Sequence, residues 1–146
     1  MLHYAKFIGL AIMVTMIWVT SDPNASQPRF SSGQPKSTGA IVNGKAEGTW
    51  TWWYENGKKM TEGFFVNGKR SGTWNTWYEN GPLKSESTYK DDKLNGSYGE
   101  WHKNGKLKQV GNYVEDKRDG IYQYYDTTGV LLEESFFTKG ILGRKY

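Results

Sequence analysis

Cysteine is absent from this chain of 146 residues, and histidine occurs only twice. Without cysteine the protein can form no disulfide, no thiolate metal site and no cysteine nucleophile. His3 lies in an apolar leader, and His102 occupies a repeated position that elsewhere holds tyrosine, so packing explains it better than catalysis. HExxH, GxSxG, P-loop and EF-hand patterns are also missing. We therefore expect no catalytic residue, no metal site, no cofactor and no enzymatic activity.

A strong excess of one charge is missing as well. The formal net charge is only +4, whereas nucleic-acid-binding domains normally carry clustered basic residues. We therefore do not expect nucleic acid as a partner. Aliphatic residues are few, but the chain has 18 Gly, 7 Trp, 10 Tyr and 6 Phe. This composition favours hairpins with packed rings over a helical core.

A period of 24 residues organises most of the chain. Arrays with a fixed period of about 20–50 residues consist of units that each bury an apolar face against their neighbours. We predict an all-β fold, an elongated meander of antiparallel β-hairpin repeats, in a domain at 41–146 with units at 48–71, 72–95, 96–119 and 120–143. The recurring residues expected to be structural are Gly48, Gly72, Gly96, Gly120, Gly57, Gly81, Gly105, Gly129, Trp50, Trp74, Tyr98 and Tyr122.

Asn-Gly pairs mark the expected hairpin turns, as at Asn56-Gly57. A two-residue type I′ turn needs positive φ at both positions, which Asn and Gly tolerate. This turn would place Trp50 opposite Gly63, so we expect the ring to lie over that glycine on a buried face. The next hairpin follows a connecting loop.

Two of these connecting loops depart from the pattern of the others. Asp92 and Asp116 stand where the corresponding earlier loop has Gly68. Because aspartate tolerates positive φ less readily than glycine, we expect these two loops to be longer or less tight.

Two further sets of recurring residues are candidates for binding. Alternation of side chains places one aromatic residue per unit on the mostly polar face. These rings either fill gaps between units or form a ligand platform: Trp53, Trp77, Trp101 and Tyr125. A basic edge could contact phospholipid or phosphate, although solvated loops are the simpler explanation: Lys45, Lys69, Arg70, Lys93, Lys117 and Arg118.

The strings GKRSGTWNTWYENG (68–81) and EDKRDGIYQYYDTTG (115–129) resemble MORN repeats. The 24-residue spacing is similar to that of the bacterial variant found in YwqK-type proteins, which are often labelled antitoxins of toxin–antitoxin pairs. The resemblance covers about residues 41–140. It implies an elongated meander of hairpins that contacts other proteins, with phospholipid contact as a further expectation.

The N-terminus has the features of a targeting segment. Phe7 to Val19 is an apolar run that is too short for a typical membrane-spanning helix. We predict that residues 1–21 form a cleaved signal peptide or an N-terminal membrane anchor, and that residues 22–40 form a flexible Pro/Ser/Gly linker. The protein would then be exported or anchored at the envelope rather than cytoplasmic.

Three functions remain open from the sequence. The first is a scaffold that binds a protein partner at the envelope or outside the cell. The second is an antitoxin-like inhibitor, which a leader at residues 1–21 argues against. The third is an aromatic platform for a cell-wall glycan or lipid head groups. Open edge strands could also support self-association.

Overall fold

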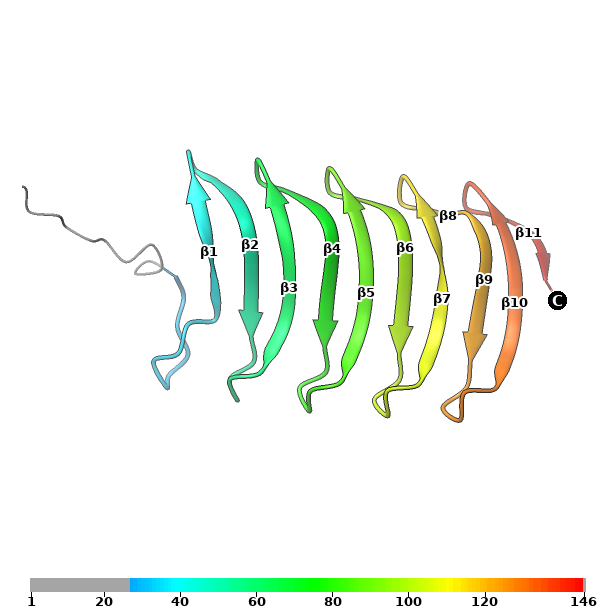
Figure 1. The fold of residues 1–146 in the computed structure, drawn as a ribbon, viewed down its shortest axis with the longest axis horizontal. Coiled ribbons are helices and arrows are strands. Elements are labelled where there is room, and N and C mark those ends of the chain that lie inside the picture. The colour runs from blue at the N-terminus through cyan, green and yellow to red at the C-terminus, as the bar shows by residue number, and fades with distance from the viewer. Residues whose placement is uncertain (1–26, 146) are drawn as a thin grey trace, which may run out of the picture.

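A computed structural model describes residues 27–145, which form one open antiparallel sheet (Figure 1). Strands pair in the order β1-β2-β3-β4-β5-β6-β7-β9-β10-β11, and the short β8 also pairs with β7. The predicted all-β meander of hairpin repeats is confirmed. The predicted leader, 1–21, lies outside the described residues. The strands are β1 (Ser37–Val42), β2 (Lys45–Trp53), β3 (Lys59–Val66), β4 (Lys69–Trp77), β5 (Leu83–Lys90), β6 (Lys93–Trp101), β7 (Leu107–Val114), β8 (Lys117–Arg118), β9 (Gly120–Tyr125), β10 (Leu131–Thr138) and β11 (Ile141–Lys145).

The prediction of a type I′ turn at Asn56-Gly57 is wrong. Gly57 has a φ of 80°, but Asn56 is not among the residues with positive φ. The Gly57 N–H donates to the Tyr54 carbonyl (3.0 Å), and the Tyr54 N–H donates to the Lys58 carbonyl (2.8 Å). This is a three-residue loop in which a β-turn is followed by a left-handed glycine. The extra residue shifts the register between Trp52 and Trp53.

The loops between hairpins are the two-residue turns, and here too the structure corrects the sequence. Both residues of each turn have positive φ: Asn43-Gly44, Asn67-Gly68, Asp91-Asp92, Glu115-Asp116 and Lys139-Gly140. The looser loops expected at Asp92 and Asp116 are therefore absent. The Asp92 carboxylate accepts a hydrogen bond from the Arg70 N–H (2.9 Å), and that of Asp116 accepts one from the Leu94 N–H (2.8 Å). Aspartate fits these turns because it tolerates the left-handed conformation and its carboxylate accepts a hydrogen bond from a backbone N–H of the preceding unit.

The rings of the buried face lie over glycines, although not over the glycines expected. Trp50 and Gly63 are Cα partners, as predicted. However, a Cβ built on Gly63 would lie 2.1 Å from the Trp74 ring, and one on Gly39 would lie 2.2 Å from the Trp50 ring. Each ring therefore covers the glycine of the strand that precedes its own, since that strand lies beside it across the two-residue turn. This packing leaves Trp50 and Trp74 only 8% exposed.

The structure also corrects the predicted linker for residues 27–40; residues 22–26 lie outside the described part. Ser37–Val42 is strand β1, which pairs with β2. Before it, the Phe30 N–H donates to the Gln34 carbonyl (2.8 Å) and the Gly33 N–H donates to the Phe30 carbonyl (2.9 Å). Residues Phe30–Gln34 therefore form the same type of loop as Tyr54–Lys58, which lies one 24-residue period later in the chain. The described part of the array thus begins with the second half of a further unit.

Candidate binding surfaces

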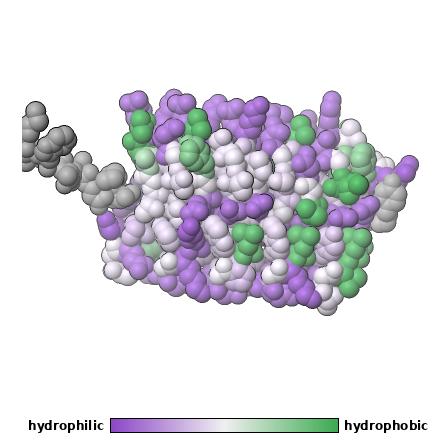
Figure 2. Space-filling model, viewed as in Figure 1, coloured by the Kyte–Doolittle hydropathy of each residue, from purple (hydrophilic) through white to green (hydrophobic). Residues whose placement is uncertain are grey.

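The sheet is a single layer, so both of its faces are available for contact. In the view of Figure 2, apolar residues appear as separate spots among polar ones, with the largest group towards the C-terminal strands. The face that carries Trp50 and Trp74 is here called the aromatic face. Rings on it form two clusters. The first ring cluster is Trp50, Trp52, Phe65, Trp74 and Tyr89, and the second ring cluster is Tyr98, Tyr113, Tyr122, Tyr124 and Phe137.

Each cluster is held by edge-to-face contacts, which suit the quadrupoles of aromatic rings. In the first, the ring centres of Phe65 and Trp74 are 5.0 Å apart at 89°. In the second, those of Tyr113 and Tyr122 are 5.8 Å apart at 89°. Tyr122 is completely buried. The packing roles predicted for Trp50, Trp74 and Tyr122 therefore fit the structure.

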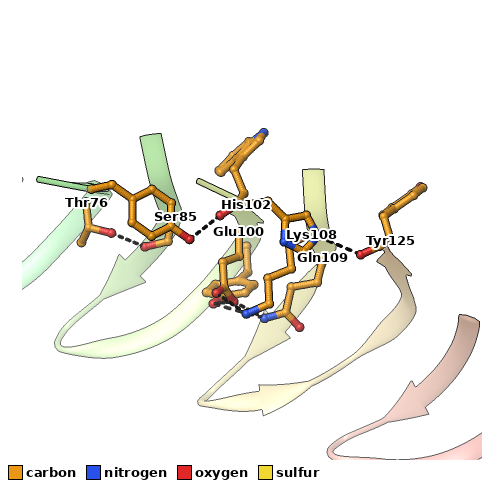
Figure 3. Close-up of polar contacts among 10 residues, drawn as sticks. Thr76, Ser85, Glu100, His102, Lys108, Gln109 and Tyr125 are labelled. Atoms are coloured by element: carbon orange, nitrogen blue, oxygen red, sulfur yellow. Dashed lines mark hydrogen bonds and ion pairs between the residues drawn. The ribbon is translucent and has the colours of Figure 1, made fainter. Parts of the chain in front are cut away.

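A polar break separates the two clusters (Figure 3). It is here defined as Thr76, Ser85, Glu100 and Gln109. The Thr76 and Ser85 hydroxyls are 2.6 Å apart, and the Gln109 amide donates to the Glu100 carboxylate over 2.5 Å. Sequence reasoning missed this break. The signal was available, because Thr76 and Glu100 occupy the repeat position of Trp52 and Tyr124.

The charge of Glu100 in the polar break is compensated by hydrogen bonds from neighbouring side chains. Burial opposes ionisation of Glu100, but hydrogen bonds from Lys108 (2.8 Å) and Gln109 outweigh it, and the pKa of Glu100 lies below its ordinary value. The Tyr98 hydroxyl also donates to Glu100 (3.2 Å). Burial and the nearby Glu100 charge raise the pKa of Tyr98 to about 12. These groups form one hydrogen-bonded polar cluster.

The hairpin loops are joined by a ladder of side chains. The Tyr54 hydroxyl donates to the Trp77 carbonyl, and the Tyr78 hydroxyl donates to the Trp101 carbonyl, both over 2.8 Å. His102 takes the same position in the next unit, where its Nε2 lies 3.0 Å from the Tyr125 carbonyl (Figure 3). His102 thus takes the place of the two tyrosines in the ladder.

The opposite face carries the aromatic row, which is Trp53, Trp77, Trp101 and Tyr125. All four side chains are half-buried. They end the first strands of successive hairpins, and their partners across the sheet are Lys59, Leu83, Leu107 and Leu131. Gly99 lies beneath the Trp101 ring, since a Cβ there would be 2.7 Å from it. The Lys59 Nζ lies 5.8 Å from the centre of the Trp77 ring.

The predicted basic edge is divided between two places. Lys45, Lys69, Lys93 and Lys117 each follow a two-residue turn, and Lys93 is paired with Glu115. The arginines instead stack on rings of the aromatic face: Arg70 lies 4.1 Å from the centre of Tyr89, and Arg118 lies 5.0 Å from that of Tyr122. The edge therefore presents fewer free cations than the sequence suggested.

Neither a metal site nor a membrane-spanning helix is found within residues 27–145. No three histidines, aspartates or glutamates of this part lie close enough to hold a metal ion. None of its segments forms a helix long and apolar enough to cross a membrane.

Comparison with known families supplies the assignment. A family model described as "MORN repeat variant" matches residues 46–67, 70–91, 94–115 and 118–139, which together are more than half of the chain. The chain belongs to this family. Each matched MORN segment covers the two strands of one hairpin and ends in the following two-residue turn, so the matches and the observed units agree. No curated protein matches the chain.

Proposed function

We propose that this MORN repeat protein is a non-enzymatic scaffold that binds a protein partner through its aromatic face, at the cell envelope or outside the cell. The observation that carries the proposal is the aromatic face itself. It carries ten rings, of which Trp50, Trp74 and Tyr122 are buried and the other seven are half-buried, and no second layer within residues 27–145 covers it. Repeat arrays typically bind partners along such extended faces.

The composition of this face resembles that of protein interfaces. Tyr, Trp, Phe and Arg are enriched in interfaces and supply most of their strongest contacts. Here Arg70 and Arg118 are already stacked on rings, which limits the side-chain entropy lost on binding. A small-molecule site would instead be an enclosed apolar cavity with a few converging polar groups.

The two ring clusters suggest the size of the partner. Their centres are about four strands apart, or roughly 19 Å, since neighbouring strands are about 4.8 Å apart. A partner would thus place two apolar regions on the clusters and a polar region over the break at Thr76, Ser85, Glu100 and Gln109.

Site-specific photo-cross-linking in the native cells tests this surface. A photoreactive residue replaces Thr76 in the polar break, and a matched control carries it at Thr73, which is exposed on the opposite face of the same strand. We expect a discrete cross-linked protein from position 76 and none from position 73. Equal products from both positions, or a product from position 73 alone, would contradict the proposed face.

The location rests on residues 1–21 and is tested separately. Cell fractionation with N-terminal sequencing should give a processed chain outside the cytoplasm, or an intact chain in the membrane. An intact soluble chain in the cytosol would overturn the location and favour the inhibitor hypothesis.

A further inference from the structure

The aromatic row has a geometry that the protein-binding proposal does not use. Its rings lie on the face opposite the ring clusters, because Trp53 follows Trp52 directly and successive side chains alternate between faces. They occupy equivalent positions in β2, β4, β6 and β9, so they form a straight line across the strands. Each ring is half-buried and keeps part of its surface open to solvent.

The spacing of this row is set by the sheet. Successive rings are two strands apart, which is about 9.5 Å at the usual strand separation. The four rings therefore extend over six strand intervals, or roughly 29 Å. Leu83 lies between Trp77 and Trp101, and Leu107 lies between Trp101 and Tyr125, whereas Lys59 lies between Trp53 and Trp77.

The polar groups beside the row select against an anionic ligand. The adjacent row towards the middle of the strands contains Glu62, Asn75, Glu86, Gln123 and Glu134. Glu86 is exposed, while Glu62 and Glu134 are half-buried. Lys59, which lies beside Trp53 in the row itself, is paired with Glu62 (2.7 Å). The remaining carboxylates, those of Glu86 and Glu134, disfavour phosphate and lipid head groups, and all three carboxylates can accept hydrogen bonds from hydroxyl groups. The complementary ligand is neutral and rich in hydroxyls.

We propose that the aromatic row binds a neutral, linear β-1,4-linked glycan. Successive sugars in such a chain are related by about half a turn, so every second sugar presents the same face, and the repeat of two sugars is comparable in length to a pair of strands. A sugar face carries C–H groups that pack on an aromatic ring, while its hydroxyls point sideways. Four rings would then hold alternate sugars of a segment of about seven.

The test uses the full chain and defined carbohydrates. Depletion from solution by insoluble cellulose and chitin is compared with depletion by starch, whose α-links do not give alternating faces. Tryptophan fluorescence is then titrated with soluble β-1,4-linked oligosaccharides of two to six sugars. We expect retention on at least one β-linked polymer, none on starch, and affinity that rises with each added pair of sugars.

Variants separate stacking from folding. Trp77→Leu keeps an apolar side chain like the neighbouring Leu83 but removes the ring, so binding should weaken about tenfold. Trp77→Tyr keeps a ring and should retain most of the affinity. Phe64→Ala is the control, because Phe64 is an aromatic residue on the same face, 44% exposed and outside the row. It should bind like the wild type.

Several results would overturn the proposal. These are no binding to any β-1,4-linked polymer, equal binding to starch, or unchanged affinity in both Trp77→Leu and a Trp101→Leu variant with wild-type melting temperature. Retention on anionic vesicles in place of glycans would assign the row to lipid instead. The row and the ring clusters lie on opposite faces, so a negative result leaves the protein-binding proposal standing.

Discussion

Replacing Gly63 with alanine tests the packing rule of the array. The new Cβ would lie 2.1 Å from the Trp74 ring, far closer than atoms can approach, and the ring is only 8% exposed. The φ of Gly63 is not in the left-handed region, so backbone strain adds nothing. Because the ring must leave its site, the loss should approach that of Trp→Ala in a core, about 3–5 kcal/mol.

Three comparisons isolate this cause. Gly72→Ala meets no atom within 4 Å but has a φ of 69°, so it should cost only the left-handed penalty, about 1–2 kcal/mol. In a Trp74→Ala background, Gly63→Ala should cost almost nothing, because the ring it displaces is gone. A Trp50→Ala background should leave most of the cost of Gly63→Ala in place, since the Trp50 ring lies over Gly39 instead.

Urea unfolding followed by circular dichroism at 25 °C measures these free energies. The double-mutant cycle of Gly63 and Trp74 should give a coupling of about 3 kcal/mol, well above the roughly 0.5 kcal/mol within which independent sites add. Additive costs for this pair, or a stronger coupling of Gly63 to Trp50, would refute the assignment of rings to glycines.

Three smaller predictions concern the contacts around this core. Tyr54→Phe removes the hydroxyl bound to the Trp77 carbonyl and should cost about 1 kcal/mol in urea unfolding. Arg118→Ala removes the guanidinium stacked on Tyr122 and should cost about 1–2 kcal/mol, whereas Arg118→Lys should restore only part of this. Carboxyls such as Glu100 have pKa values in the folded protein below the ordinary 4.5. Their contribution to stability is therefore complete above pH 4.5 and is lost as the pH falls through the folded pKa values. Melting temperatures should be level from about pH 7 to 5 and decline below about 4.5.

Sequence periodicity predicted the architecture because glycines and rings at a fixed spacing leave few alternatives to stacked hairpins. It predicted the pairing of Trp50 with Gly63 correctly, since the error at the hairpin loop is absorbed by a bulge next to Trp53. It could not tell which glycine each ring covers. Side chains of twisted strands lean towards one neighbour, and one-dimensional spacing carries no information about that direction.

The type of each turn was harder to predict than its place. Asn-Gly suits both a type I′ turn and the second half of a three-residue loop, so Asn56-Gly57 was ambiguous. Asp91-Asp92 forms a type I′ turn without any glycine because the Asp92 side chain is bound to Arg70 of the preceding unit. That bond joins residues 22 apart and becomes visible only once the units are stacked.

The N-terminal boundary was missed for a different reason. Composition made residues 22–40 look unable to fold, and Pro and Ser do dominate them. The 24-residue period nevertheless continues backwards to Gly39 and Gly33. Where composition and period disagree, the period is the better guide here, because a half-unit needs little apolar surface of its own when Trp50 of the next unit covers it.

The middle of the array is built differently from its two halves. Lys58 and Lys106 each donate a hydrogen bond from the side-chain amine to a backbone carbonyl of the following hairpin loop. In the second unit the corresponding residue is Pro82, which has no such amine. Pro82 also lacks the backbone N–H that in the lysine units donates to the asparagine side chain of the same loop. No ring contact joins Tyr89 to Tyr98 within the described residues. Two ring clusters therefore stabilise two halves, and they meet at a junction held by backbone pairing and by hydrogen bonds such as that from Tyr78 to the Trp101 carbonyl.

This junction coincides with the polar break of the aromatic face. In the second unit Thr76 replaces a ring and Pro82 replaces a lysine, and in the third unit Glu100 replaces a ring, so ring packing and one loop contact are reduced at the same junction. A uniform array would bind any apolar surface along its length. An array interrupted by Glu100 and Gln109 penalises a partner that is apolar throughout, because its middle would remove the half-buried Glu100 carboxylate from solvent without adding a hydrogen bond. The departure from the repeat thus gives the proposed protein-binding face a basis for specificity, at the expense of stability between the second and third units.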